Sequence, residues 1–173
     1  VPRPIARNLI YALLFGAGDA KLGQTADMKG KGKALRAKLM LAFPGFESMM
    51  DTMNDQYDAN LYETDRGFMT GIDGRKIFCE RFKSFNALLQ AYEAVTCKAA
   101  EVETMRMVRE EGLDAKIICM MHDEVNMDVS EADAPRVAEI LEYAFGPFVT
   151  EKYNLNVPMG GSAKIGDTWY DVH

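Results

Sequence analysis

A long helical pattern that runs directly into two strand-like segments limits what this chain can fold into. Apolar side chains recur at helical spacing through residues 84–111, and Gly112 supplies a stop signal at the end of the pattern. The positions on one side are Leu88, Tyr92, Val95, Ala99, Val102 and Met105. The pattern predicts one long, central and mostly buried helix.

The segment that follows, AKIICMMHDEVNMDV, predicts a β-hairpin. Its first strand, residues 115–121, is apolar on both faces, as is typical of an interior strand in a sheet covered by helices. The second strand is expected over residues 124–129, so His122 and Asp123 lie at or near the tip.

Beyond the hairpin the sequence predicts one further helix and a terminal extended segment. Ser130 is followed three residues later by Asp133, which resembles a capping box opening a helix to about residue 153. An extended stretch from Val157, expected as a terminal strand, leads to the closing sequence GDTWYDVH.

The first half of the chain is predicted to be mainly helical. Expected elements are helices over residues 4–15, 29–43 and 46–59, and a hairpin over 68–80 around Asp73-Gly74. Helices followed by an antiparallel sheet packed on long helices give an α+β fold class.

Composition excludes several classes of protein. In 173 residues, 48% are apolar and 27% are charged, which is typical of a folded soluble protein and not of a disordered or fibrous one. The longest apolar run, residues 9–15, is too short to cross a membrane. The three cysteines lack metal-ligand spacing, which favours reduced thiols in a cytosol-like compartment over a disulfide framework or a zinc site.

Charge is distributed unevenly along the chain. Residues 1–43 hold eight Lys/Arg and two Asp, and therefore carry +6, whereas the remaining residues carry −12. The positively charged segment could bind phosphate, and the negatively charged segment could bind metal cations. Two simply solvated faces are the alternative.

Four side chains of the first helix fall on one flank, because a step of four residues drifts only about 40° around a helix. They are Arg3, Arg7, Tyr11 and Phe15. Arginine binds phosphate oxygens bidentately, and aromatic faces stack on sugars and bases. This stripe would suit a nucleoside triphosphate, unless the arginines are only solvated and the aromatics belong to the core.

Two adjacent carboxylates, Asp123 and Glu124, lie beside His122 at the expected hairpin tip. Carboxylate oxygens are the ligands that hard divalent cations prefer, and a turn on a rigid sheet can fix them in space. An exposed acidic turn without function is the alternative.

Together these segments resemble the polymerase domain of family A DNA polymerases, and the phage branch in particular. RPIARNLIYALLFGAG resembles the motif of the fingers helix, and MMHDEV resembles the His-Asp-Glu motif of the palm. GIDGRKI, FNALLQ and GDTWYDVH resemble further family segments in the same order. The resemblance implies a fingers subdomain over residues 1–83 and a palm portion over residues 84–173, together an incomplete right-hand fold.

The resemblance also implies roles on the fingers helix. Arg3 would hold the outer phosphates of the incoming deoxynucleotide, and Tyr11 would stack near its deoxyribose. Arg7 stands where the family has a lysine that contacts the triphosphate and protonates the leaving group, and arginine is a poor proton donor near neutral pH. Phe15 would lie beside the templating base, and Gly16 would let DNA approach closely.

Further roles follow for the second half of the chain. Asn86 and Gln90 would touch template and primer in the minor groove, where they could check pairing geometry without reading sequence. His122 would sit near the primer terminus. Asp123 would ligate the catalytic metals, and Glu124 would support that site.

The implied reaction is attack of a primer 3′-hydroxyl on the α-phosphate of a deoxynucleoside triphosphate, assisted by two Mg²⁺ ions. The family carries a second metal-binding aspartate on a palm strand that precedes the fingers helix, within a part of the enzyme that we call the upstream polymerase segment. This chain begins at Val1, directly before the helix motif. We therefore expect the chain to be inactive without that segment, with primer-template DNA as its partner and the cytoplasm, of the host if phage-encoded, as its location.

Two other classes remain open. The chain could be a non-catalytic nucleotide- or DNA-binding module. It could also be a metal-dependent phosphohydrolase that uses Asp123 and Glu124 with His122, although the only other histidine, His173, lies at the terminus.

Overall fold

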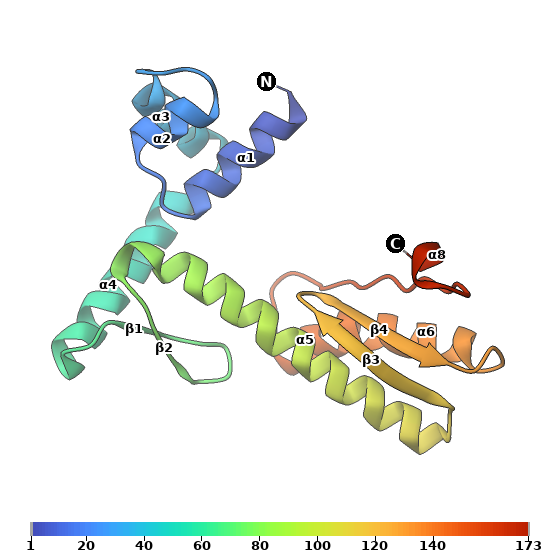
Figure 1. Cartoon of the computed structure of the whole chain (residues 1–173). Coiled ribbons are helices and arrows are strands. Elements are labelled where there is room, and N and C mark those ends of the chain that lie inside the picture. The colour runs from blue at the N-terminus through green and yellow to red at the C-terminus, as the bar shows by residue number, and fades with distance from the viewer. Residues whose placement is uncertain (1, 173) are drawn as a thin grey trace. The chain divides into compact units, whose positions relative to one another are not determined.

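The computed structural model describes residues 2–172, so His173 lies outside the described residues. The chain divides into two compact units, residues 1–91 and 92–173 (Figure 1). Helix α5 (Ser84–Glu111) contributes its first turns to one unit and its remainder to the other. The division into fingers and palm at residue 84 concerns function, and it stays a prediction.

Helices and one small hairpin build the first unit. The elements are α1 (Arg3–Leu14), α2 (Asp19–Thr25), α3 (Gly32–Ala42), α4 (Phe46–Thr64), a 3-10 turn (Arg81–Lys83), and the antiparallel strands β1 (Phe68–Thr70) and β2 (Lys76–Phe78). The expected hairpin is confirmed, with a φ of 81° at Gly74 in its turn. Helix α2 was not expected from the sequence, and α4 continues past residue 59.

The core of the first unit fixes α1 against α2 and α3. Leu9, Leu13 and Leu22 are buried, and apolar residues of α3 pack against them. Arg36 on α3 donates to the carboxylate of Asp19 and to the carbonyl oxygen of Ala17. The connection from α1 to α2 is therefore held in place by packing and by a charged side chain.

The second unit packs helices against one face of a two-stranded sheet (Figure 1). Its elements are the rest of α5, β3 (Ala115–Met121), β4 (Glu124–Val129), α6 (Ala134–Tyr143), a π-helical turn (Ala144–Phe148), α7 (Val149–Lys152) and α8 (Trp169–Val172). The two strands and their turn lie where the sequence predicted them. The expected terminal strand is wrong, because residues 157–168 run without strand pairing into α8.

Helix α5 has the expected ends but not the expected burial. Val102 is 70% exposed and Tyr92 is 38% exposed, so the helix is not mostly buried. Within the second unit its buried residues include Val95, on the expected side, and also Thr96, Ala100 and Thr104, which repeat every four residues. The hydroxyl of Thr104 donates to the carbonyl oxygen of Ala100, which satisfies it inside the core.

Strand β3 is not covered on both faces within the described residues. Ile118 is 67% exposed, and exposed and less exposed side chains largely alternate along the strand. β3 pairs antiparallel with β4, and the register shifts between Ile117 and Cys119, which indicates a bulge. The expectation of an interior strand is therefore wrong for the part of the chain that the structure describes.

The helical run after the sheet is interrupted where Pro147 lies. Proline has no backbone N–H to donate to the preceding turn, so a regular α-helix cannot continue through it. The chain widens into the π-helical turn there and resumes as α7. The helix expected to reach residue 153 is thus present as three consecutive helical segments.

Asp133 at the start of α6 has a charge that we predict to stabilise the second unit. Its carboxylate accepts hydrogen bonds from the amide of Asp114 (2.9 Å) and the hydroxyl of Ser130 (2.8 Å), and these lower its pKa. A carboxyl group whose pKa is lower in the folded chain stabilises the fold at pH values above its unfolded-state pKa, which is about 3.9. This stabilisation is lost as the pH falls through the lower pKa of the folded state. Asp133→Asn should therefore lower the Tm at pH 7.

The same variant has a pH signature that separates charge from shape. Asparagine keeps the size of Asp133 but carries no charge, so the Tm difference from the unmodified chain should shrink as the pH is lowered below about 4. Thermal unfolding followed by circular dichroism across this range measures it. A Tm difference that stays constant with pH would show that the charge contributes nothing.

Among residues 2–172, no helix combines the length and the apolar character that crossing a membrane requires. The three cysteines are free thiols, as the sequence predicted. Burial raises the pKa of Cys79 and Cys97, so both stay protonated near neutral pH.

Candidate functional site

The four side chains predicted to share a flank of α1 lie on its exposed side. Arg3 and Arg7 are on this flank, where Tyr11 is 50% exposed and Phe15 is 52% exposed. The opposite side of the helix buries Leu9 and Leu13 in the core of the first unit. The aromatic rings are therefore not core residues within the described part of this chain.

The two aromatic rings of the flank stack on each other. Tyr11 and Phe15 stack with their centroids 6.0 Å apart and their planes inclined by 15°. Parallel, half-exposed rings offer a face to a sugar or a base. Among the described residues, neither Arg3 nor Arg7 has an ion-pair partner, so both guanidinium groups can receive an anion. We call the surface made of Arg3, Arg7, Tyr11 and Phe15 the α1 stripe.

The backbone conformation that ends α1 explains the glycine at position 16. Its φ is 72°, and its N–H donates to the carbonyl oxygen of Leu13 while the N–H of Ala17 donates to that of Ala12. This pair of bonds is a Schellman motif, which favours glycine at this position. A Cβ at Gly16 would also lie 2.9 Å from the carbonyl oxygen of Phe82.

We expect Gly16→Ala to destabilise the first unit by about 1–3 kcal/mol, because an alanine would have to adopt a positive φ and displace the backbone at Phe82. Denaturant unfolding measures this free energy. Gly160→Ala is the matched control, since an added Cβ there meets nothing within 4 Å, and it should change stability by less than about 0.5 kcal/mol. If Gly16→Ala keeps its stability and loses only DNA binding, close approach of DNA is the reason for the glycine.

Asn86 and Gln90 lie one turn apart in the part of α5 that belongs to the first unit. Gln90 is exposed, while Asn86 is partly buried and its Oδ1 accepts no hydrogen bond from another described residue. A buried amide oxygen without a donor is unfavourable by about 1–3 kcal/mol. Because this oxygen is itself shielded from solvent, the expected contact of Asn86 with DNA stays a prediction.

The His-Asp-Glu segment forms the tip of the β3–β4 hairpin. Met121 pairs with Glu124, which leaves His122 and Asp123 as a two-residue loop, and all three motif residues are exposed. His122 has a φ of 58°, a conformation uncommon for residues other than glycine. The turn therefore presents the imidazole and both carboxylates to solvent from a fixed point at the end of the sheet.

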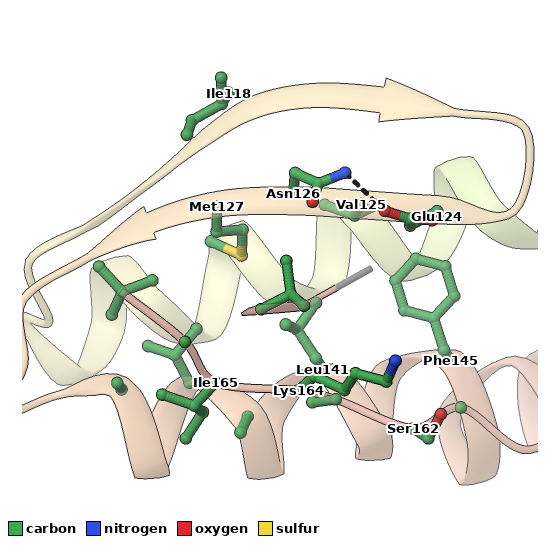
Figure 2. Close-up of a pocket in the computed structure, with 18 of the residues that line it drawn as sticks. Ile118, Glu124, Val125, Asn126, Met127, Leu141, Phe145, Ser162, Lys164 and Ile165 are labelled. Carbon is green, nitrogen blue, oxygen red and sulfur yellow. Dashed lines mark hydrogen bonds between the residues drawn. The ribbon is translucent and has the colours of Figure 1, made fainter. Parts of the chain in front are cut away.

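Glu124 is oriented by a neighbour on its own strand. The side-chain amide of Asn126 donates to Oε1 of Glu124 at 2.9 Å, as Figure 2 shows. Sequence reasoning did not identify Asn126. The sequence indicates this role only by position, since a polar residue two positions after Glu124 lies on the same face of the strand.

The carboxylates at this tip are suitable ligands for a divalent cation, but they are too few to hold one by themselves. Their oxygens are hard donors of the type that Mg²⁺ prefers. Among residues 2–172, however, no group of three or more His, Cys, Asp or Glu side chains lies close enough to hold a metal ion. A metal ion at Asp123 would therefore need ligands from outside the described residues.

A cavity of about 950 Å³ lies within the second unit, between strand β4, helix α6 and the segment of residues 159–169 (Figure 2). Val125, Met127 and Leu141 contribute apolar side chains to its lining, to which Asp123 and Glu124 also belong. No periodic pattern in the sequence predicts this cavity, because the terminal segment that bounds it has no regular structure.

The structure thus groups the predicted residues within each unit. Residues 1–91 contain the α1 stripe, Gly16, Asn86 and Gln90, and the close approach of Gly16 to Phe82 joins the end of α1 to the segment that leads into α5. Residues 92–173 contain His122, Asp123 and Glu124 at one turn.

Comparison with known proteins defines the class of protein. The sequence profile described as DNA polymerase family A matches residues 2–171. The chain belongs to this family, and its mixed helical fold with small antiparallel sheets is the fold of part of the family's polymerase domain.

Proteins of phages and bacteria are among its relatives. The chain is 28% identical over 99% of its length to the DNA-directed DNA polymerase of Escherichia phage Phieco32, covering 28% of that protein. It is 30% identical over 99% of its length to the polymerase of Enterobacteria phage T3, covering 27% of it. It is 25% identical over 96% of its length to DNA polymerase I of Geobacillus stearothermophilus, covering 20% of it. The chain therefore spans less than a third of the length of each of these relatives.

A solved structure shows the same fold. The POL domain of Pol1 from M. smegmatis, in complex with DNA primer-template and dNTP, matches 98% of this chain with a TM-score of 0.85, at 20% sequence identity. The match covers 31% of that protein chain.

Proposed function

We propose that this chain supplies the fingers and part of the palm of a template-directed DNA polymerase, which adds deoxynucleotides to a primer 3′-hydroxyl. The observation that carries the proposal is the α1 stripe. The chain is a member of family A. Its stripe places two arginines, which have no ion-pair partner among the described residues, next to two stacked, half-exposed aromatic rings on one flank of a helix.

Each member of the stripe has a role in holding the nucleotide. Arg3 binds the outer phosphates through its guanidinium fork, and Arg7 binds the triphosphate beside it. Tyr11 packs against the deoxyribose, and Phe15 lies beside the templating base. Since arginine keeps its proton near neutral pH, Arg7 neutralises the charge that develops on the leaving pyrophosphate more readily than it donates a proton.

The remaining assignments concern DNA and the metal. Asn86 and Gln90 contact the minor groove of the primer-template duplex, and His122 lies near the primer terminus. Asp123 is a ligand for Mg²⁺ together with an aspartate of the upstream polymerase segment, and Glu124 supports Asp123. Mg²⁺ bound in this way would neutralise charge on the reacting phosphate.

The chain works together with the upstream polymerase segment, and a cytoplasmic location follows from that role. The need for this segment is supported by two observations. The chain spans only 28% of a phage relative, and no cluster of three potential ligands occurs among residues 2–172.

Primer extension tests the proposal against its alternatives. The chain is combined with the upstream polymerase segment, primed template, Mg²⁺ and deoxynucleotides, and each component is also assayed alone. An elongated primer only in the combined sample supports the polymerase. Release of nucleotide phosphate without elongation would indicate a phosphohydrolase, and binding of DNA without either product would indicate a non-catalytic module.

A further inference from the structure

One side chain on strand β4 holds Glu124 by a hydrogen bond. The amide Nδ2 of Asn126 lies 2.9 Å from Oε1 of Glu124, and the two residues are two positions apart on the same face of the strand (Figure 2). An ionised carboxylate only accepts hydrogen bonds, so the amide nitrogen of Asn126, and not its oxygen, faces Glu124. The contact therefore requires a donor at position 126.

Asn126 is more enclosed than the carboxylate that it holds. Glu124 is exposed at the end of the sheet, whereas Asn126 is half-buried. An exposed glutamate populates several rotamers, and any role that needs one of them requires the side chain to be ordered first. The hydrogen bond from Asn126 orders Glu124 before anything binds.

The hairpin places Asn126 in the same regularly paired segment as the turn. The register is continuous from the pair Met121 and Glu124 to the pair Cys119 and Asn126, and it shifts directly beyond, at Ile118. Bulges of this kind bend a strand and change the direction of its side chains, and they are frequent beside active sites. Because no register shift separates Asn126 from Glu124, the backbone fixes their relative position.

Two negative charges occupy neighbouring positions at this tip. Asp123, Glu124 and Asn126 all line the cavity of the second unit. Like charges repel each other, which favours conformers that separate the two carboxylates. A hydrogen bond donated to a charged acceptor is stronger than one between neutral groups, so Asn126 can hold Glu124 in one conformer against this repulsion.

We propose that Asn126 is a positioning residue for nucleotidyl transfer, which holds Glu124 in the conformer that supports the Mg²⁺ site at Asp123. The inference rests on the proposed function, in which Glu124 supports Asp123. Asn126 contacts neither the metal nor the nucleotide in this role. It reduces the ordering that Glu124 must undergo when the cation binds. Loss of the amide therefore weakens metal binding and leaves the rate at saturating Mg²⁺ nearly unchanged.

The dependence of extension on the Mg²⁺ concentration tests the inference, with the full chain combined with the upstream polymerase segment and primed template. Asn126→Leu keeps a similar size and removes the donor. It should raise the Mg²⁺ concentration for half-maximal single-turnover extension by about three- to tenfold. Asn126→Gln keeps an amide donor and should recover part of this loss.

A binding measurement without turnover accompanies the rates. The primer then ends in a dideoxynucleotide, and electron paramagnetic resonance measures the Kd of Mn²⁺ in place of Mg²⁺. Asn126→Leu should weaken Mn²⁺ binding by the same factor as it raises the Mg²⁺ requirement.

Two controls isolate the cause. Asp128→Leu introduces the same side chain at the next exposed position on this face of β4, and it should leave both measurements within about twofold. In a chain that carries Glu124→Ala, Asn126→Leu should have no further effect, because no carboxylate remains to be positioned.

The possible outcomes separate the inference from the proposed function. If Glu124→Ala weakens Mn²⁺ binding while Asn126→Leu behaves like Asp128→Leu, the inference alone is overturned. A full effect of Asn126→Leu in the Glu124→Ala chain, or a lower rate at saturating Mg²⁺ with an unchanged half-maximal concentration, overturns it as well. If the unmodified sample extends no primer, or if Glu124→Ala changes neither measurement, the proposed function or its assignment of Glu124 fails, and the inference fails with it.

Discussion

Asp123→Ala should reduce primer extension by about 10³-fold when the chain is combined with the upstream polymerase segment. Metal coordination at the reacting phosphate contributes several kcal/mol, and each step of about 1.36 kcal/mol corresponds to a factor of ten in rate. Asp123 lies in an exposed two-residue loop, so its carboxylate can be removed without opening the core. Single-turnover extension rates measure the effect.

Asp128→Ala is the matched control for this variant. Asp128 is an exposed carboxylate on strand β4, opposite Lys116 in the register, and has no role in the proposed site. It should leave the rate within about twofold. If Asp123→Ala extends primers as fast as Asp128→Ala, Asp123 is not a metal ligand.

The second large effect is expected from Arg3→Ala, which should weaken deoxynucleotide binding by about 10- to 100-fold. Hydrogen bonds to charged groups contribute about 1.5–3 kcal/mol, and about 1.4 kcal/mol is a factor of ten in affinity. Arg3→Lys should recover part of the loss, because lysine restores the charge without the bidentate fork. The apparent Kd for the nucleotide in single-turnover extension measures both variants.

Lys38→Ala controls for the loss of one exposed positive charge from the first unit. Lys38 is an exposed residue of α3 and does not belong to the α1 stripe. Its Kd for the nucleotide should match that of the unmodified chain. An equal Kd for Arg3→Ala and Lys38→Ala would remove Arg3 from the triphosphate site.

The elements that sequence reasoning predicted best carry strong local signals. The predicted ends of α5 at Ser84 and Glu111 and both strands of the β3–β4 hairpin agree with the structure. A glycine follows the helix, and a tight turn separates the apolar first strand from the alternating second strand. Helix α2 was missed because it has only seven residues and depends on tertiary contacts. Leu22 is fully buried against α1, and Arg36 anchors Asp19 from α3.

The wrong expectations arose where a strand or a buried face depends on a partner. The segment after Val157 looked like a strand, but no described strand pairs with it. On α5 the expected apolar side included the exposed Val102, while the buried residues also include the small or polar Thr96, Ala100 and Thr104. Hydropathy patterns cannot identify such positions, because a threonine can satisfy its hydroxyl on the helix backbone.

The part of the candidate site that follows helical periodicity could be predicted from the sequence. Spacing by four placed Arg3, Arg7, Tyr11 and Phe15 on one flank, and this flank is the exposed side of α1. The stacking of the two rings and the hydrogen bond from Asn126 to Glu124 depend on side-chain geometry, which the pattern does not determine. The roles of these residues in catalysis stay predictions.

The most direct test of the proposed function is incorporation of single nucleotides on four primed templates that differ only in the first unpaired base. The chain is combined with the upstream polymerase segment and offered one deoxynucleotide at a time. We predict elongation only with the complementary nucleotide on each template, and none when the chain is omitted. Elongation that does not depend on the template base, or that proceeds equally well without this chain, would contradict its assignment as the fingers and palm part of a polymerase.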